Sequence, residues 1–577
     1  MKNTYSLTVL RKRLFAYFCL LAVLILIIII RLFFVEVVNS NTLQQKAIDQ
    51  WTRELPVKAK RGNILSSDGK ILATSADSFA VFVRTRSVKD SQKVSQILGE
   101  LFGVDSQSLQ QKIDKKATSE ITVKRQVTKN EIIKLTDYNL DGVYYSVDNK
   151  RVYPYDEMLC SVLGYTTVDG LGQGGLEKYY DKYLAGIDGE ILYEADLLGS
   201  DLSSKTPTFI PSVNGLDVVL TIDYEIQLIV ESALNKVMHE YTPKGAAAVV
   251  LNPQNGQILA MANLPSYDLN NVPRDDIESL NSLSRNGLVV DSYEPGSTFK
   301  MVTALANIEE SLNGNPNAKP LNYVYNSSRY RQVAGGKIKC WSDHKNGKHQ
   351  NQTLQEALNN SCNPCFTDIA LSLGTETFYK YIKALNFGKV TGVDFLGEAS
   401  GMLIPETAVK EGDLARIGFG QSVAVTPLQL AAAASACING GLYYTPKLVK
   451  EIKTSDGKVV EIMKPSTAKR VASKKASQIL AEYLENVVTN GSGKQCYIEG
   501  YKVGGKTGTA QKFVDGKIAQ GKYVMSFVGF FPSNAPKYLC LVTVDEPIGG
   551  NYGSTVAAPV VYDIFTNIIS AKSIAKQ

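Results

Sequence analysis

The chain has 577 residues, 44% of them hydrophobic and 20% charged, with a net charge of +6. That length is more than one hydrophobic core serves, so roughly three or four units are expected. The mild charge, without a basic helix or a basic patch interleaved with aromatic residues, gives no case for nucleic-acid binding, and no nucleic-acid partner is expected.

The first feature along the chain is an apolar run. Residues 14–30 carry no charge, and the run continues past the single Arg31 to Val35. About 20 apolar residues span a bilayer core, so residues 14–38 are predicted to form one transmembrane anchor. A cleavable signal peptide is the alternative, but the run exceeds the usual apolar region of about 7–15 residues and no small-x-small cleavage site follows it.

Basic residues before this run predict its orientation. Lys2 and the basic stretch 11–13 precede it, and cytoplasmic flanks of membrane helices are enriched in such residues. We therefore expect residues 1–13 to form a cytoplasmic tail. The chain beyond about residue 38 is expected to lie outside the cytoplasmic membrane.

Residues 39–215 mix strand and helix signals. They begin as a polar stalk with apolar residues at helical spacing over 43–51. The elements predicted next are a hairpin around a turn at 66–69, short amphipathic helices between 90 and 140, a strand over 144–155, a helix over 174–184 and a strand over 189–193. No catalytic constellation is found in this part, and Arg61, Arg151 and Glu177 are predicted to form structural ion pairs.

From about residue 216 the pattern becomes α+β. The predicted strands are 217–222, 246–251, 257–262, 502–511, 524–531 and 538–544, and the predicted helices include 226–239, 354–373, 426–438 and 556–572. Strands at both ends with helices between them predict one antiparallel sheet flanked by helices and completed by the C-terminal part of the chain.

Three short motifs in this second part carry the chemistry. Ser297 follows a Pro-Gly break and opens a predicted helix, which places Lys300 on the same helix face. Ser361 and Asn363 stand at a break in helical sequence, and the stretch 506–508, Lys-Thr-Gly, lies in the first C-terminal strand. Alone, Ser-x-x-Lys occurs by chance in most long chains, and a capping serine before a surface lysine is then the favoured interpretation. The ordered set Ser-x-x-Lys, Ser-x-Asn and Lys-Thr-Gly closely resembles that of penicillin-binding proteins and class A β-lactamases.

These residue types suit acyl transfer through a serine. Ser297 is predicted to attack a peptide carbonyl, with Lys300 as its base once burial or a second cation keeps the amine neutral. Ser361 and Lys506 are predicted to hold Lys300 partly neutral or to relay the proton to the leaving amine. Asn363 is predicted to orient Lys300 and the substrate backbone.

The strand that begins near Lys506 is predicted to bind an extended peptide along its edge. Lys506, Thr507 and Thr509 are the candidates for binding a terminal carboxylate, and Gly508 allows close approach. The backbone N–H groups of Ser297 and Thr509 are predicted to form the oxyanion hole. No cofactor is expected and no metal ligand is assigned.

Further stretches extend this pattern to nearly the whole chain. They are Arg61-Gly62-Asn63-Ile64 with Asp68-Gly69, residues 151–154 with 163–165, residues 175–177 with Leu184 and Gly186, and residues 418–421 with Thr426, Pro427 and Gln429. With the three motifs, they resemble the class B penicillin-binding proteins, which are membrane-anchored D,D-transpeptidases. Ser66 and Ser67 stand where that family usually has Asp-Arg, which puts the ion pairing of the first motif in question.

The resemblance implies two extracytoplasmic domains. Residues 39–215 would be an elongated pedestal of the penicillin-binding protein dimerisation type, and residues 216–577 a penicillin-binding transpeptidase domain. The implied activity is cross-linking of peptidoglycan stem peptides in septal or sporulation wall synthesis, with β-lactams as covalent inhibitors. The implied partners are the membrane, a multi-span glycan polymerase of the SEDS family and other divisome proteins. Residues 340–341 and 361–363 resemble most the division and sporulation branch of Gram-positive bacteria.

Cysteines near the second motif support two side hypotheses. Cys362 lies inside Ser-x-Asn and Cys340 precedes it by 22 residues, so a redox-sensitive pair is one prediction and two packed thiols the alternative. Cys340, Asp343, His344 and His349 are residue types that bind zinc, but their irregular spacing favours a polar surface loop.

Two other classes of function stay open. A D,D-carboxypeptidase or a β-lactamase uses the same serine chemistry, although no deacylating glutamate can be placed by motif and the anchor disfavours a β-lactamase. A non-enzymatic β-lactam sensor or divisome scaffold is the other class. A sensor would carry more membrane spans, and a scaffold would not need all three motifs intact.

Overall fold

The computed structural model describes residues 7–43, 52–194, 208–326, 328–334, 336–342, 344, 349–464, 467–514 and 517–576. Their contacts divide the chain into two compact units. The smaller unit is made of Met1–Ala59, Ser78–Asp148 and Ile187–Val213, and the larger of Lys60–Asp77, Asn149–Gly186 and Asn214–Gln577.

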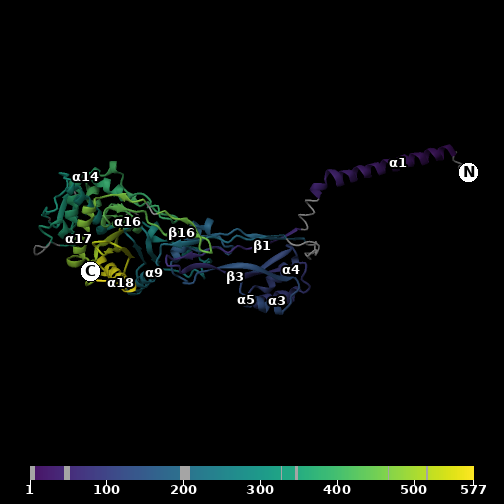
Figure 1. The fold of residues 1–577 in the computed structure, drawn as a ribbon, viewed down its shortest axis with the longest axis horizontal. Helices are drawn as coiled ribbons and strands as arrows, with labels where there is room; N and C mark the ends of the chain where they lie inside the picture. Colours follow the sequence, from purple (N-terminus) through teal and green to yellow (C-terminus); the bar gives the residue numbers. More distant parts are fainter. Residues whose placement is uncertain are drawn as a thin grey trace. The chain divides into compact units, whose positions relative to one another are not determined.

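The N-terminal apolar run forms one long helix. Helix α1 (Leu7–Phe33), purple in Figure 1, continues through a π-helical turn, η1 (Phe34–Val38). An 18-residue window within this 32-residue segment reaches a mean hydropathy of 3.2, and none of that window is buried against the described chain. At about 48 Å the helix exceeds a bilayer core of about 30 Å, so it fits a single-pass membrane anchor. Residues 44–51, the middle of the predicted stalk, lie outside the described residues.

The smaller unit has its own apolar core. Apolar positions at helical spacing on α3 (Ser91–Phe102) pack against strand β3 (Ile71–Arg84), with Val94 and Leu98 facing Val81. The other elements of this unit are α4 (Ser106–Lys115), β4 (Glu120–Val127), α5 (Lys129–Asp137), β5 (Val143–Val152) and a sheet of β1 (Thr52–Val57), β6 (Gly189–Glu194) and β7 (Thr208–Ile210). The predicted mixture of short helices and strands is confirmed here.

Two arginines in the larger unit share one buried carboxylate. The Nε atoms of Arg61 and Arg151 donate to the two oxygens of Glu177 at 2.6 and 2.7 Å, and Arg61 also reaches Asp181 at 2.7 Å. Glu177 is fully buried. The predicted ion pairs are therefore confirmed. Ser66 lies in the hairpin turn and takes no part in them.

The elements around this cluster join distant parts of the chain into one sheet. The hairpin predicted around residues 66–69 is confirmed, because β2 (Ile64–Leu65) pairs antiparallel with β3. On its other side β2 pairs in parallel with β8 (Asp217–Leu220). The remaining elements are α6 (Cys160–Leu163), α7 (Gly175–Tyr179), α8 (Asp181–Leu184), β16 (Val449–Lys453) and β17 (Val459–Ile462).

A five-stranded antiparallel sheet forms the centre of the larger unit. Its order is β10-β9-β21-β20-β19, so the C-terminal strands complete the N-terminal hairpin as predicted. The strands are β9 (Gly245–Leu251), β10 (Ile258–Leu264), β19 (Gly504–Val514), β20 (Lys517–Phe531) and β21 (Tyr538–Asp545). β19 is the edge strand of this sheet.

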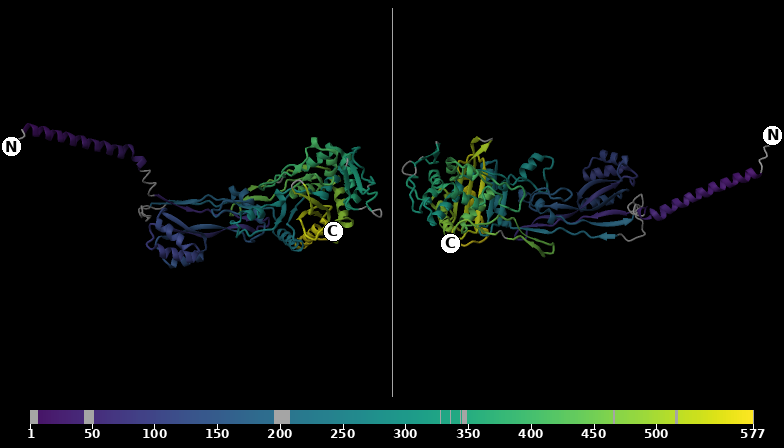
Figure 2. Two further views of the ribbon diagram at one scale, coloured as in Figure 1. Left: turned by 180° about the vertical axis from the view of Figure 1, so that it is seen from behind. Right: turned by 90° about the horizontal axis from the view of Figure 1, so that it is seen from above.

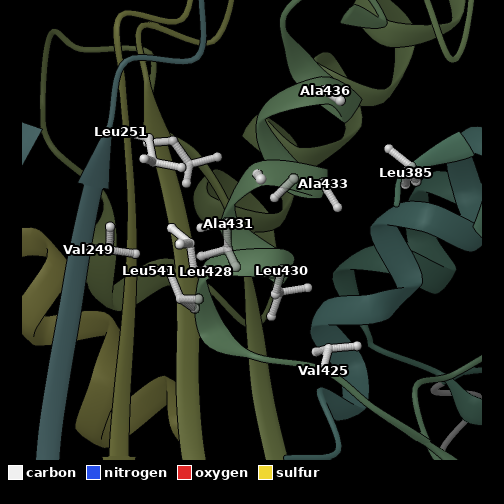
Figure 3. Packing of buried hydrophobic residues seen from close by; sticks show 14 of the residues in the cluster. Val249, Leu251, Leu385, Val425, Leu428, Leu430, Ala431, Ala433, Ala436 and Leu541 are labelled. Carbon is white, nitrogen blue, oxygen red and sulfur yellow. The ribbon is translucent and has the colours of Figure 1, made fainter. Parts of the chain in front are cut away.

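Helices cover both faces of this sheet because successive side chains of a strand point to opposite faces, and those of β9 and β21 are apolar and buried nearly throughout. Ala246, Ala248 and Val250 face α9 (Tyr224–Tyr241) and α18 (Gly553–Ala571), the yellow C-terminal helix in Figures 1 and 2. On the other face, Leu428 and Ala431 of α16 (Pro427–Ile438) point toward Val249, Leu251 and Leu541, as Figure 3 shows. The alanines of α16 let the helix approach the sheet closely.

The remaining helices form an all-helical part beside α16. They are α10 (Ile277–Leu283), α11 (Gly287–Val290), α12 (Lys300–Leu312), α13 (Leu354–Asn359), α14 (Asn363–Ala384), α15 (Glu411–Ile417) and α17 (Lys474–Asn490). Short strand pairs complete the unit: β11 (Tyr330–Val333) with β12 (Gly336–Lys339), β13 (Met402–Leu403) with β14 (Val423–Ala424), and β15 (Leu442–Tyr443) with β18 (Lys469–Arg470). The α+β architecture predicted from the sequence is confirmed.

Substituting Glu177→Ala is expected to destabilise the larger unit strongly. It leaves two buried guanidinium groups without their shared carboxylate, which costs about 3–5 kcal/mol for a buried pair. Denaturant unfolding of the full-length protein, followed by circular dichroism, measures the loss. The control is Lys236→Ala, which removes a solvent-exposed pair with Asp563 and should cost less than about 1 kcal/mol. Equal effects of the two substitutions would contradict the structural role.

Candidate active site

Ser297 lies in a 3-10 turn that leads directly into α12. This turn, η2 (Gly296–Phe299), starts at Gly296 with a left-handed φ of 54°, a conformation that suits glycine, and the Gly296 N–H donates to the Gly420 carbonyl at 2.9 Å. The sequence predicts an α-helical turn here. The 3-10 geometry aligns residues three apart even more closely, and it brings Lys300 Nζ to 3.0 Å from Ser297 Oγ.

The second motif occupies the break between two helices. α13 ends at Asn359 and α14 begins at Asn363, with Pro364 in its first turn. Ser361 between them takes a left-handed φ of 50°. The break turns Ser361 and the first residue of α14 toward Lys300, which a continuous helix would not do.

Lys300 Nζ has four polar neighbours. It lies 2.8 Å from the Ser361 carbonyl oxygen, 2.7 Å from Asn363 Oδ1, 3.2 Å from Ser361 Oγ and 3.0 Å from Ser297 Oγ. The orientation of the Asn363 amide is fixed because its Nδ2 donates to the Lys339 carbonyl at 3.2 Å. The Ser361 carbonyl oxygen and Asn363 Oδ1 are therefore two neighbours that can only accept hydrogen bonds. A neutral amine has two N–H donors for them and one lone pair left for a hydroxyl proton.

Lys506 supplies a second buried amine from strand β19. Its Nζ lies 3.0 Å from Ser361 Oγ, so Ser361 stands between the two lysines. Both lysine side chains are fully buried. Burial lowers the pKa of Lys300 to about 8, and burial together with the charge of Lys300 lowers the pKa of Lys506 well below its usual range.

The edge strand β19 passes close to the serine turn at Gly508. A Cβ on Gly508 would lie 2.3 Å from Ser526 Oγ and 3.0 Å from the Thr298 methyl group. Glycine is therefore required for this approach. Thr509 Oγ1 accepts from the N–H of Gly553 at 3.0 Å, which fixes the strand end against α18.

The structure brings together the side chains of all five predicted catalytic residues. Ser297 and Asn363 are half-buried. Thr509, which is predicted to bind the substrate carboxylate and the oxyanion, is half-buried as well. The side chains of Lys300 and Lys506 are fully buried below them. A pocket of about 540 Å³ continues from β19 beyond Ala510 and is lined by Tyr293, Glu294, Leu403, Val423, Ala510 and Lys512 among others.

Sequence reasoning missed several groups that support the site. Ser492 Oγ lies 3.3 Å from Thr507 Oγ1, and Glu294 accepts from the Ser422 N–H at 2.8 Å. Lys339 contributes only its carbonyl, which no sequence pattern reveals. The sequence pattern indicates the stretch 418–421, but it does not reveal the hydrogen bond that the Gly420 carbonyl accepts from the Gly296 N–H.

The expectation of a polar surface loop at Cys340, His344 and His349 is wrong. All three side chains are buried, with exposed fractions of 0%, 8% and 6%. Their donor atoms and the Cys362 sulfur lie within 4.8 Å of one another. Asp343, the other residue of the predicted set, lies outside the described residues. The Cys340 and Cys362 sulfurs are 3.9 Å apart as free thiols, and the predicted redox pairing stays a prediction.

Two family models match this chain. The penicillin-binding protein transpeptidase domain matches residues 246–566, and the penicillin-binding protein dimerisation domain matches residues 56–220. The chain is 39% identical to stage V sporulation protein D of Bacillus subtilis, over 96% of this chain and 85% of that protein. It is 26% identical to the peptidoglycan D,D-transpeptidase FtsI of Escherichia coli, over 94% and 89%.

Solved structures share the fold. A peptidoglycan synthetase from Bifidobacterium adolescentis aligns with a TM-score of 0.72 at 24% identity, covering 91% of this chain and 98% of that one. Penicillin binding protein 2X from Streptococcus thermophilus aligns with a TM-score of 0.72 at 23% identity, covering 91% and 80%. The chain belongs to the penicillin-binding protein transpeptidase family, and its two matched domains place it in class B.

Adding one methyl group at Gly508 is expected to impair the site without unfolding the protein. Gly508→Ala pushes β19 away from the serine turn, and misplacement by about 1 Å costs on the order of 100-fold in rate. The measurement is the rate of labelling by a fluorescent penicillin. Gly412→Ala is the matched control, because a Cβ at that helical glycine meets nothing closer than 3.8 Å and labelling should not change. Wild-type labelling of Gly508→Ala would contradict the close approach.

Proposed function

We propose that this chain is a peptidoglycan D,D-transpeptidase that cross-links stem peptides through an acyl-enzyme on Ser297. The observation that carries the proposal is the bonding of Lys300, whose two obligate acceptors leave one lone pair aimed at the Ser297 hydroxyl. A serine hydroxyl becomes a competent nucleophile when such a base takes its proton.

The acylation step follows from this geometry. Lys300 Nζ takes the proton of Ser297 as Oγ bonds to the carbonyl carbon of the penultimate D-alanine. The proton then passes through Ser361 Oγ, which lies within hydrogen-bond distance of both lysines, to the nitrogen of the leaving D-alanine as its C–N bond breaks. In the second step an acceptor amine attacks the ester, gives its proton to the same base, and Ser297 is released with its proton restored.

The edge of β19 suits an extended donor peptide. Among the strands that the structure describes, β19 pairs only with β20, so its other edge can add a strand. We assign the terminal carboxylate to Lys506, Thr507 and Thr509, with Gly508 allowing its approach. The developing oxyanion is assigned to the backbone N–H groups of Ser297 and Thr509.

The remaining assignments complete the cellular picture. Residues 1–13 face the cytoplasm and 14–38 anchor the chain. Outside the membrane, residues 39–215 form the pedestal and 216–577 the catalytic domain, and the pedestal segments 60–77 and 149–186 pack into the same compact unit as the catalytic domain. The pedestal docks a SEDS-family glycan polymerase and other divisome proteins. The similarity to stage V sporulation protein D favours wall synthesis in sporulation or division.

Replacing the nucleophile tests the acyl-enzyme. Ser297→Ala is expected to lose labelling by a fluorescent penicillin completely, because Ser361, the other hydroxyl within reach of Lys300 Nζ, is buried beneath the site. Mass spectrometry of the wild type should place the adduct on the peptide that contains Ser297. The substitution should leave the unfolding midpoint nearly unchanged, since only one half-buried oxygen is removed.

Labelling of Ser297→Ala at the wild-type rate would refute the assignment.

Acylation is expected to rise with pH through the pKa of Lys300. Lys300 acts as a base only when neutral, and its pKa of about 8 means that the neutral fraction falls about tenfold for each pH unit below that value. The second-order rate constant of penicillin acylation, measured from pH 6 to 10, should level off above about pH 8. A profile that is flat over this range would exclude Lys300 as the base.

A product assay separates the transferase from its hydrolase rival. Lipid-linked peptidoglycan precursor polymerised in vitro serves as substrate, and the products are separated by mass. Cross-linked dimers are expected; tetrapeptide products without cross-links would instead identify a carboxypeptidase.

A further inference from the structure

Four metal-binding side chains gather beside the Ser-x-Asn motif. They are Cys340, His344, His349 and Cys362, and their ligand atoms all lie within 4.8 Å of one another. All four side chains are buried. Two of the three histidines of the whole chain are in this cluster. Burying four such groups at one point is costly unless they share a partner.

Two distances within the cluster match those of a tetrahedral zinc site, one between two sulfurs and one between a sulfur and a ring nitrogen. Zinc–sulfur bonds of about 2.3 Å and zinc–nitrogen bonds of about 2.0–2.1 Å, at tetrahedral angles, separate two sulfurs by about 3.8 Å and a sulfur from a nitrogen by about 3.6 Å. The Cys340 and Cys362 sulfurs are 3.9 Å apart, and Cys340 Sγ lies 3.5 Å from His349 Nδ1. The two imidazole rings have centroids 5.1 Å apart.

The backbone of the two histidines is also held in an unusual conformation. His344 has a φ of 55° and His349 a φ of 63°, the left-handed region that residues other than glycine seldom adopt. Such strain persists where the surroundings fix the residue, and it is frequent at ligand clamps. The loop is fixed further by Gln352, whose Nε2 donates to the His349 carbonyl at 2.7 Å.

We propose that Cys340, His344, His349 and Cys362 bind one zinc ion in a closed structural site. Two thiolates and two imidazoles are a donor set that zinc prefers. With all four positions taken by protein, the ion has no open position for a reactant. Its role is to position residues, not to activate water.

The ion would fix the motif that holds the catalytic lysine. Cys362 is flanked by Ser361 and Asn363, both of which contact Lys300. Cys340 follows Lys339, whose carbonyl orients the Asn363 amide. Through Cys340 and Cys362, zinc would therefore hold the Lys339 carbonyl and the Ser-x-Asn motif in place on either side of the Asn363 amide. This consequence for acylation rests on the proposed function, whereas the binding of zinc does not.

A disulfide between Cys340 and Cys362 is the competing interpretation. It requires the sulfurs to approach to about 2.05 Å and gives the two histidines no role. It predicts activity that depends on reductant, whereas the zinc site predicts activity that depends on metal and on the histidines.

Metal content of the full-length protein in detergent tests the site directly. We expect one zinc ion per chain by inductively coupled plasma mass spectrometry. His349→Ala and Cys340→Ser should lose most of it, and His349→Cys should retain it because a thiolate can replace the imidazole. His239→Ala is the matched control, since that third histidine is exposed on α9, and it should keep its zinc. Cobalt exchanged into the wild type should show thiolate-to-cobalt absorption that Cys340→Ser lacks.

A second experiment tests whether the zinc ion affects acylation at the active site. Chelation should slow fluorescent penicillin labelling of the wild type by roughly tenfold or more, zinc alone should restore it, and reductant alone should not change it. Ser297→Ala should bind zinc normally without being labelled, which separates failure of the zinc site from failure of the proposed function. Absence of zinc from the wild type, or equal zinc in His349→Ala and wild type, would overturn the proposal. Restoration by reductant without metal would establish the disulfide instead.

Discussion

The site depends on one constraint: Lys300 is buried, and none of the described residues offers it a carboxylate partner. Its neighbours are hydroxyl and carbonyl oxygens from the serine turn and the Ser-x-Asn break. Desolvation outweighs the attraction of the nearby cysteine sulfurs and disfavours the ammonium form. Lys506 adds a second buried amine, and the two cannot both carry a charge without mutual repulsion. The surrounding layers of helix and sheet serve to keep water and acidic groups away from this pair.

The architecture explains how residues far apart in sequence reach this pair. The hairpin of β9 and β10 opens the sheet, and the C-terminal strands close it about 250 residues later. Between them the chain forms the helical part that carries Ser297, Lys300 and the Ser-x-Asn break. Because β19 is at the sheet edge, Lys506 meets the helical part there. Ser297 therefore stands at the junction of the two layers.

Much of the fold and of the candidate site could be predicted, because the sequence signals of strands, helix starts and motifs are local. Apolar runs bounded by turn residues predicted the strands. The Pro-Gly break before Ser297 predicted where its helix starts, although the first turn is 3-10 rather than α-helical. The three motifs identify their residues by type and order. Other parts depend on tertiary contacts that spacing does not encode. The carbonyl of Lys339, the hydroxyl of Ser492 and the burial of His344 and His349 belong to this group, because a loop of irregular spacing reads as exposed until its surroundings are known.

The two compact units are interleaved along the chain rather than consecutive. Segments 60–77 and 149–186 belong to the larger unit, although they alternate with segments of the smaller one. Strand β2, from the first of these segments, pairs in parallel with β8, and Arg61 and Glu177 come from the two different segments. A fragment that starts at residue 216 would therefore expose one edge of β8 and lose strands from its own sheet. Trimming this protein to its enzymatic half, by protease or by cloning, removes part of the scaffold on which that half is built.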